Sequence, residues 1–369
     1  MKKICIISAD PNFLGGVSLY TWNTINSLGR LKGFEVFWVY EGKRNRIYKK
    51  GGVTLVELKS IGKYPFSEIF FNFRVKKFLD KNYFDIINSH AIWGFWIKFY
   101  RKKENQKIIH TYHGSTYYFF KNHLKRSGII KKIGSLFSMF LGLFMEKPPW
   151  KKADRIICVS EHVKIELEGL YGKRKNIEII NAGVDIKKFR PRNKKSSKKE
   201  VGLDPNKWYG LYVGRGGFWT KGLDRVINLS KEIYKKDENY RLIIIGSERD
   251  KVKNIINKKF IVFLPSASRE ILPYYYNSAD IFFNLSRYEG GDPTLSTAEA
   301  MASGCLIVCS EDAKQEIIKD RKNGIILKKF DITDAKNVVK ISKSQKLRKG
   351  VIKNSIRMIR KSSIKNRNK

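Results

Sequence analysis

Cysteines, acidic side chains and long apolar runs are scarce in this chain of 369 residues. Its four cysteines form no C-x-x-C pair and lie within apolar stretches, so we expect buried, reduced thiols rather than a zinc site. No run reaches the ~18–20 apolar residues of a transmembrane helix. The opening MKKICIIS predicts a first strand rather than a signal peptide. These absences favour a cytoplasmic protein.

The shortage of acids leaves a large positive charge. The chain has 34 Asp and Glu against 75 Lys and Arg, a formal net charge of +41. A lysine-rich codon bias would spread such an excess evenly, but the bases cluster: residues 187–199 hold eight and residues 343–369 hold eleven, with no acid in either. Clustered positive charge favours a polyanionic partner, either nucleic acid or an anionic membrane surface.

What the chain does contain is a regular alternation of strand-like and helical patterns. The strand-like runs are Ile4–Ser8, Glu35–Tyr40, Val53–Leu58, Asp85–Asn88, Lys107–Thr111, Arg155–Val159, Ile177–Ile180, Trp208–Val213, Arg241–Ile245, Ile261–Phe263, Asp280–Leu285 and Cys305–Cys309. Strands that alternate with helices predict an α/β fold with parallel sheets.

A basic, proline-containing stretch at residues 187–207 interrupts this alternation and predicts a linker or a loop-rich domain start. We therefore expect two doubly wound, Rossmann-like domains that face each other across a ligand-binding cleft. The predicted boundaries are 1–190 for an N-terminal acceptor-binding domain, 191–345 for a C-terminal nucleotide-sugar-binding domain, and 346–369 for a basic helix or tail.

The stretch SRYEGGDPTLSTAEAMASG, residues 286–304, lies between two strand-like runs. Glu289 and Glu299 flank its glycine-rich turn. A segment that only packs in a core has no need of two carboxylates there, whereas ionised carboxylates are strong acceptors for sugar hydroxyls. The stretch therefore predicts a sugar-binding site at the carboxyl end of a parallel strand.

Two glycine-rich turns are candidates for phosphate binding. In LYVGRGGFWTKGLDRVINL, residues 211–229, Arg215, Lys221 and the turn amides could hold a diphosphate, although an ordinary strand-to-helix turn would look the same. The turn matches neither the P-loop nor the dinucleotide fingerprint. Gly15 and Gly16 follow the first strand and could approach a phosphate closely.

Three histidines lie near the ends of strand-like runs. His90 and His113 follow strands, where a side chain of an α/β domain points toward the ligand, and His113 is the better candidate for contact with a substrate. His110 lies within its strand and is expected to be structural. No carboxylate accompanies these histidines, so they do not predict a metal site.

Taken in order, these segments resemble the family-4 retaining glycosyltransferases, which have the GT-B fold. The resemblance extends from residue 3 to about 327 and is carried by Gly15-Gly16, His113-Gly114, Val159-Ser160, residues 181–185 (NAGVD), Val213-Gly214-Arg215, Lys221-Gly222 and Glu289 with Glu299. It implies transfer of a sugar from a nucleotide-diphosphate donor to an acceptor hydroxyl with retention of configuration. It further implies no metal and no cofactor beyond the nucleotide-sugar co-substrate.

The resemblance also implies roles for individual residues. The catalytic set would be His113, Arg215, Lys221 and Glu289, with Arg215 and Lys221 neutralising the departing diphosphate. The donor-binding set would be Gly15, Gly16, Gly214, Asp292, Thr294, Leu295 and Glu299, in which the Gly16 amide contacts the diphosphate and Glu299 grips the ribose.

The spacing of the two glutamates departs from that family. They are ten positions apart here and usually eight apart there, so the turn is two residues longer. Either Glu289 still reaches the sugar or Asp292 has taken that role. The context S-R-Y-E-G favours Glu289.

One helical segment and the net charge leave the partners open. Within residues 129–144, Ile129, Ile133, Leu136, Phe140 and Phe144 share one face, with Ile130, Phe137 and Leu141 beside them. The segment is either a core helix or a helix on an anionic membrane. The second possibility fits a glycan or lipid-linked acceptor and a peripheral location on the inner membrane face.

The alternative function is that of a nucleic-acid-binding protein without transferase activity. No nucleic-acid-binding motif is present, and the paired glutamates would repel a polyanion, so we expect no specific nucleic acid.

Overall fold

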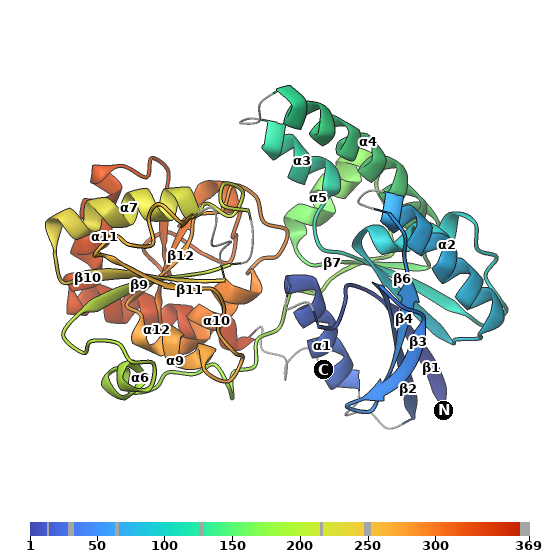
Figure 1. The fold of residues 1–369 in the computed structure, drawn as a ribbon, viewed down its shortest axis with the longest axis horizontal. Helices are drawn as coiled ribbons and strands as arrows, with labels where there is room; N and C mark the ends of the chain where they lie inside the picture. The colour runs from blue at the N-terminus through green and yellow to red at the C-terminus, as the bar shows by residue number, and fades with distance from the viewer. Residues whose placement is uncertain are drawn as a thin grey trace. The chain divides into compact units, whose positions relative to one another are not determined.

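The computed structural model describes residues 1–12, 15–28, 33–62, 66–124, 129–214, 217–246 and 252–361 (Figure 1). The chain forms two compact units, Met1–Asn181 and Ala182–Lys369. The boundary predicted from the sequence was at residues 190 and 191. The stretch expected to be a linker or a loop-rich domain start contains a short helix, α6 (Lys194–Glu200), whose N-cap is Asn193.

The first unit is built on an eight-stranded sheet with the order β3-β4-β2-β1-β5-β6-β7-β8. All neighbouring strands are parallel except β3 and β4, which are antiparallel. The strands are β1 (Lys2–Ile7), β2 (Phe34–Gly42), β3 (Arg46–Lys50), β4 (Val53–Lys59), β5 (Ile86–His90), β6 (Lys107–Tyr112), β7 (Arg155–Cys158) and β8 (Ile177–Ile179).

Alternate residues of β1 enter two separate cores, one on each side of this sheet. Ile4 and Ile6 pack in the core beneath the first helix, whereas Cys5 and Ile7 pack in the core beneath the others. These four consecutive positions are all apolar because both faces of the strand are buried there. The helical elements are α1 (Gly16–Leu28), α2 (Phe66–Lys81), η1 (Ala91–Lys98), α3 (Thr116–Leu124), α4 (Ile129–Lys152) and α5 (Glu161–Tyr171).

Helix α4 packs on its own unit through a side that combines small and polar residues with the buried Met139, Met145 and Trp150. Ser135, Ser138 and Gly142 are buried, and a Cβ at Gly142 would lie 2.6 Å from the Thr116 side chain, so α3 and α4 approach closely there. The buried Glu146 carboxylate accepts a hydrogen bond from the Thr116 amide at 2.9 Å. The core-helix interpretation of this segment is therefore wrong, since the exposed side chains are Ile133, Leu136, Phe137, Phe140 and Phe144. The side chains of Ile129 and Ile130 lie outside the described part.

The second unit has a six-stranded, wholly parallel sheet with the order β11-β10-β9-β12-β13-β14. Its strands are β9 (Trp208–Val213), β10 (Tyr240–Ile245), β11 (Ile261–Leu264), β12 (Ile281–Asn284), β13 (Leu306–Ser310) and β14 (Ile325–Leu327). Besides α6, its helical elements are α7 (Leu223–Lys236), α9 (Leu272–Ser278), α10 (Leu295–Ser303), η2 (Glu311–Ala313), α11 (Ile332–Lys343) and α12 (Gln345–Lys361).

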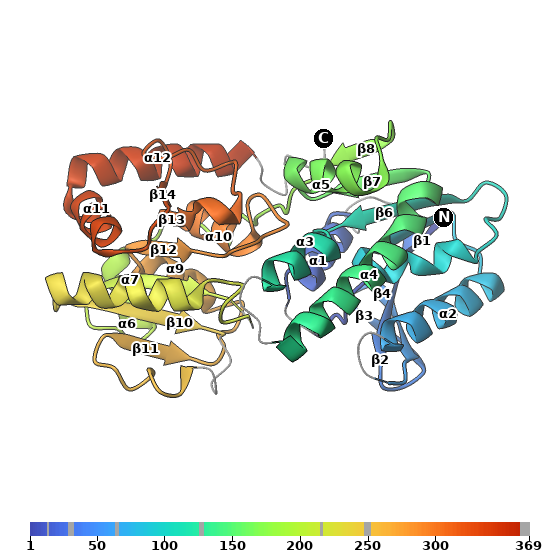
Figure 2. The ribbon, with the colours of Figure 1, turned by 90° about the horizontal axis from the view of Figure 1, so that it is seen from above.

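Helices cover both faces of this sheet. Leu242 and Ile244 of β10 pack under α7 and α11, while Ile243 and Ile245 pack under α9 and α10 (Figures 1 and 2). Helix α12 packs on α10 and α11 and inserts the fully buried Ile359. The C-terminal helix thus belongs to the core of the second unit.

A glycine joins α7 to the end of β12. Gly222 is the N-cap of α7 and has φ +68°, and a Cβ there would lie 1.9 Å from the carbonyl oxygen of Leu285. Only glycine allows this backbone-to-backbone approach. The start of α7 is consequently held against the loop that carries Glu289.

Substitution Gly222→Ala should destabilise the second unit by about 2–3 kcal/mol or more, because the left-handed backbone and the clash with a main-chain carbonyl both oppose a side chain. Denaturant unfolding of the full chain measures the loss. Gly169→Ala on α5, where a Cβ meets nothing within 4 Å, is the matched control. It should change stability by no more than about 1 kcal/mol, in the stabilising direction. Equal effects at both positions would contradict the packing argument.

Candidate active site

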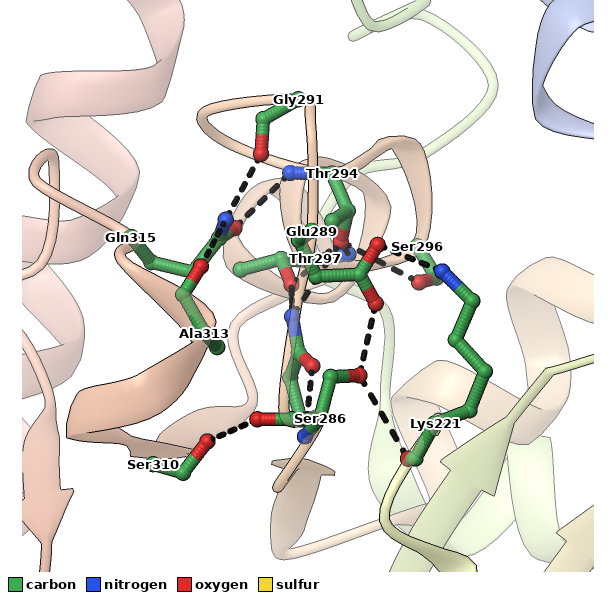
Figure 3. A network of polar contacts seen from close by, with 11 residues as sticks. Lys221, Ser286, Glu289, Gly291, Thr294, Ser296, Thr297, Ser310, Ala313 and Gln315 are labelled. Carbon is green, nitrogen blue, oxygen red and sulfur yellow. Dashed lines mark hydrogen bonds and ion pairs between the residues drawn. The ribbon is translucent and has the colours of Figure 1, made fainter. Parts of the chain in front are cut away.

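Lys221 and Glu289, 68 positions apart in the chain, lie together at the carboxyl end of the second sheet (Figure 3). The Lys221 ammonium is 2.6 Å from Glu289 Oε2, and Ser286 Oγ donates to Glu289 Oε1 at 2.6 Å. Ser286 also contacts the Lys221 carbonyl oxygen at 3.4 Å. This arrangement holds a cation and a carboxylate side by side on a fixed backbone.

The turn after Glu289 is attached to the segment that follows β13. The Asp292 carboxylate accepts from the Ile317 amide at 3.1 and 3.2 Å. Gln315 bridges the turn, since its Nε2 donates to the Gly291 carbonyl at 2.7 Å and its Oε1 accepts from the Thr294 amide at 2.8 Å (Figure 3). Asp292 therefore has a structural contact of its own, whereas Glu289 faces Lys221.

Thr294 and Leu295 start α10. Thr294 is the N-cap, and its hydroxyl accepts from the Thr297 amide at 3.3 Å. Asn284, the last residue of β12, donates to the Thr297 hydroxyl at 3.0 Å and so ties the strand to the helix. The amides at such a helix start favour an anionic group.

Glu299 has different surroundings from Glu289. It is buried within α10, its Oε1 lies 2.6 Å from an Arg269 nitrogen, and Tyr276 donates to Oε2 at 3.0 Å. Burial raises the pKa of the Glu299 carboxyl, and the Arg269 charge opposes this rise. The guanidinium of Arg269 is also 4.9 Å from the Phe189 ring centroid. The two glutamates thus form two separate pairs rather than one symmetrical site.

The first unit places two histidines in contact. His90 is the last residue of β5, His113 follows β6, and the distance from His90 Nδ1 to His113 Nε2 is 2.9 Å. Their rings stack at 5.1 Å, and Tyr20 of α1 lies edge-on to His113 at 4.9 Å. Burial lowers the pKa of His113 to about 3. His113 is therefore uncharged at neutral pH.

His110 lies within β6, as predicted for a structural residue. It is fully buried, and its Nδ1 is 2.8 Å from the Ser89 hydroxyl. Burial lowers the pKa of His110 to about 3 as well, with the nearby His113 contributing.

The glycine candidates lie at strand-to-helix turns. Gly16 is the first residue of α1, and a Cβ there would meet nothing within 4 Å, so the space where a side chain would lie is open. Gly15 precedes it. Gly214 follows β9 and donates its amide to the Ile245 carbonyl at 3.1 Å, so that amide already has a partner. Arg215 lies outside the described residues.

Several site residues escaped the sequence analysis. Ser286, Arg269, Tyr276 and Gln315 each contact a predicted residue. Ser286 opens the S-R-Y-E-G context but was given no role of its own, and the other three stand in no recognisable pattern. Gln315 lies in the polar run Lys314–Glu316, which is typical of a surface loop. Arg269 is one of the many basic residues of this chain, and nothing in its neighbourhood distinguishes it from a residue at the surface. Among the described residues, no three His, Cys, Asp or Glu side chains are grouped so as to hold a metal ion.

Sequence profiles of known families match nearly the whole chain. The profile of Glycosyltransferase Family 4 matches residues 14–188, and that of Glycosyl transferases group 1 matches residues 193–358. The chain belongs to the group 1 glycosyltransferases. The predicted family is thereby confirmed.

Curated relatives of this glycosyltransferase include two uncharacterized glycosyltransferases of Methanocaldococcus jannaschii. One is 27% identical over 270 residues, covering 71% of this chain and 65% of the relative. The other is 25% identical over 360 residues, covering 95% and 91%. The chain thus spans less than two thirds of the first relative's length and most of the second's.

Three solved structures share the fold of this glycosyltransferase. Sucrose-phosphate synthase from Thermosynechococcus elongatus has a TM-score of 0.81 at 18% identity, covering 98% of this chain and 94% of that one. WaaG, a glycosyltransferase involved in lipopolysaccharide biosynthesis, scores 0.76 at 13%, covering 99% and 98%. HepE of Anabaena, solved with UDP-glucose, scores 0.74 at 13%, covering 100% and 97%. The predicted GT-B fold with two Rossmann-like domains is confirmed.

Acid should destabilise the glycosyltransferase partly through His110. Its pKa is about 3 when folded and about 6.5 ordinarily, so below pH 6.5 the unfolded chain binds a proton that the folded chain does not. Stability therefore falls as the pH drops from 6.5 toward 3. In urea unfolding between pH 7 and 5, His110→Gln should flatten this dependence by up to about 1.4 kcal/mol per pH unit. Parallel curves for the two proteins would contradict the assignment.

Breaking the Arg269–Glu299 pair should cost more than breaking an exposed pair. Arg269→Ala leaves a buried carboxylate without its cation and should lower the unfolding free energy by about 2–4 kcal/mol, somewhat less than for a fully buried pair because Arg269 is partly exposed. Arg155→Ala, which removes the exposed pair with Glu178, is the control and should cost less than about 1 kcal/mol. Similar losses would show that burial of Glu299 has no special weight.

Proposed function

We propose that this glycosyltransferase moves a sugar from a nucleotide-diphosphate donor to an acceptor hydroxyl with retention of configuration and without a metal ion. The observation that carries the proposal is the Lys221–Glu289 pair at the carboxyl end of a parallel sheet. The lysine side chain is 36% exposed, so its ammonium can contact a phosphate while it stays beside the carboxylate.

The chemical requirement is stabilisation of charge on the departing diphosphate. Lys221 and Arg215 supply positive charge, and the amides at Gly16 and at Leu295 supply oriented dipoles. The amide of Gly214 is bonded to the Ile245 carbonyl. Any contact of Gly214 with the donor would therefore not be made by this amide. Groups fixed before the reaction stabilise developing charge without reorganisation.

The carboxylates serve hydroxyl groups in this proposal. Glu289 accepts from the donor sugar and Glu299 from the ribose. Asp292 is the weaker candidate for the sugar, since its carboxylate holds the Ile317 amide. His113 is neutral at the pH of the cell and would contact the sugar through hydrogen bonding rather than charge.

A nucleotide-sugar donor is supported by the UDP-glucose bound to HepE. A glycan or lipid-linked acceptor at an anionic membrane surface is supported by the role of WaaG in lipopolysaccharide biosynthesis and by the basic clusters of this chain. A location on the inner membrane face would follow. The nucleic-acid-binding alternative rests on net charge alone.

Removal of the cationic side chains should abolish most of the activity. A donor is first selected by thermal shift across UDP, GDP and ADP sugars, because a true donor stabilises the folded state. With that donor, Arg215→Ala and Lys221→Ala should each lower kcat by several-fold to about 10³-fold. Lys235→Ala, an exposed lysine on α7, is the control and should retain full activity. Near-normal turnover of the folded double variant would refute the proposed roles.

A further inference from the structure

The outward face of α4 is apolar, which is unusual for a surface helix. Ile133 and Phe140 are 63% and 75% exposed, and Leu136, Phe137 and Phe144 are each exposed by nearly half or more. The inner face, with its buried serines and Gly142, is fixed by α3 and by the contacts of Glu146. A rotation that buried the apolar side chains would break those contacts, so the exposure is built into the packing.

The apolar surface continues from α4 onto α2. Ring contacts form a chain from Phe144 to Phe95 at 5.1 Å, from Phe95 to Phe99 at 5.5 Å, and from Phe99 to Phe73 at 5.2 Å. Phe73 shares one side of α2 with Phe70 and Phe66, which precede it by three and seven positions. We call this surface the aromatic face; its exposed members are Phe66, Phe70, Phe73, Phe99, Ile133, Leu136, Phe137, Phe140 and Phe144.

Positive charge accompanies the aromatic face. The Lys98 ammonium is 4.2 Å from the Phe144 ring centroid. Exposed lysines on α4 are Lys132, Lys147, Lys151 and Lys152, and its one acid, Glu146, is buried. Two copies of the chain joined through this face would bring like charges together, which disfavours self-association. An apolar surface bordered by lysines instead matches an anionic lipid layer, where rings enter the acyl region and ammonium groups meet phosphates.

We propose that the aromatic face of α2, η1 and α4 is the surface by which this protein lies on an anionic lipid bilayer. Among the described residues no helix is both long and apolar enough to cross a bilayer, so the contact is one of shallow insertion. This inference rests on the proposed function, because contact with a bilayer would serve to reach a membrane-linked acceptor.

Sedimentation of the full-length protein with vesicles tests the inference. Wild-type protein should bind phosphatidylcholine vesicles that contain phosphatidylglycerol, and bind vesicles of phosphatidylcholine alone more weakly. Two double variants remove rings from different helices: Phe137→Ser with Phe140→Ser, and Phe70→Ser with Phe73→Ser. Each should lower the partition coefficient on the anionic vesicles by about tenfold or more.

Ile165→Ser is the matched control, because Ile165 is 58% exposed on α5 of the same unit and is not part of the aromatic face. It should bind within about twofold of wild type. Lys147→Glu with Lys151→Glu should weaken binding to anionic vesicles and leave the weaker binding to neutral ones unchanged. Thermal unfolding of each variant shows that it is folded.

Three results would overturn the inference. In the first, both ring variants bind anionic vesicles as strongly as wild type. In the second, Ile165→Ser loses as much vesicle binding as the ring variants do. In the third, wild type is a dimer in solution and the ring variants are monomers. Donor hydrolysis or transfer to a water-soluble acceptor is measured on the same proteins and should be unchanged in the ring variants. A protein that binds vesicles through this face but uses no nucleotide sugar would disprove the proposed function alone.

Discussion

The second unit depends on one close approach between two backbone segments. Gly222 brings the start of α7 against the Leu285 carbonyl, and the amide of Arg287 donates to the Thr220 carbonyl at 2.8 Å beside it. These contacts fix the lysine that precedes Gly222 and the loop that carries Glu289 in one frame. The 2.6 Å ion pair therefore forms between two side chains whose backbone positions are fixed relative to each other, and not between two flexible surface groups. The polar chemistry of the site thus follows from a steric constraint on the main chain.

The two units use their polar residues differently. In the second unit the candidate carboxylates are paired with cations, Glu289 with Lys221 and Glu299 with Arg269. In the first unit, the candidate residues at the ends of β5 and β6 are imidazoles that burial keeps uncharged, and these histidines contact one another, a serine hydroxyl and an aromatic ring. A neutral cluster tolerates a low dielectric surrounding without counter-charges, whereas ionised groups do not.

Much of this structure could be predicted from the sequence, because parallel strands buried on both faces appear as short apolar runs. The twelve predicted strands all exist. Two strands were missed: β3, which is mostly exposed and basic and has no such run, and β14, whose apolar run is only three residues long. Lys221 and Glu289 could each be selected as candidates from their glycine-rich surroundings, but their ion pair could not be predicted. Gln315, Arg269 and Tyr276 could not, since their partners are distant in the chain and no periodic pattern connects them. For α4, the periodicity of the sequence identified two faces of the helix but not which of them packs against the rest of the unit. Gly142, which contacts α3, and Glu146, whose carbonyl accepts from Tyr112 of β6, determine which face is buried.

Hydrogen bonds hold the turn at residues 290–294 and the segment 315–317 together. Asp292 and Gln315 attach the turn at both its middle and its end. If this turn were exchanged between related enzymes without the segment beyond β13, the sequence of the loop would be transferred, but its conformation would not be preserved. A change in the conformation of the turn should accordingly require compensating changes in the segment 315–317.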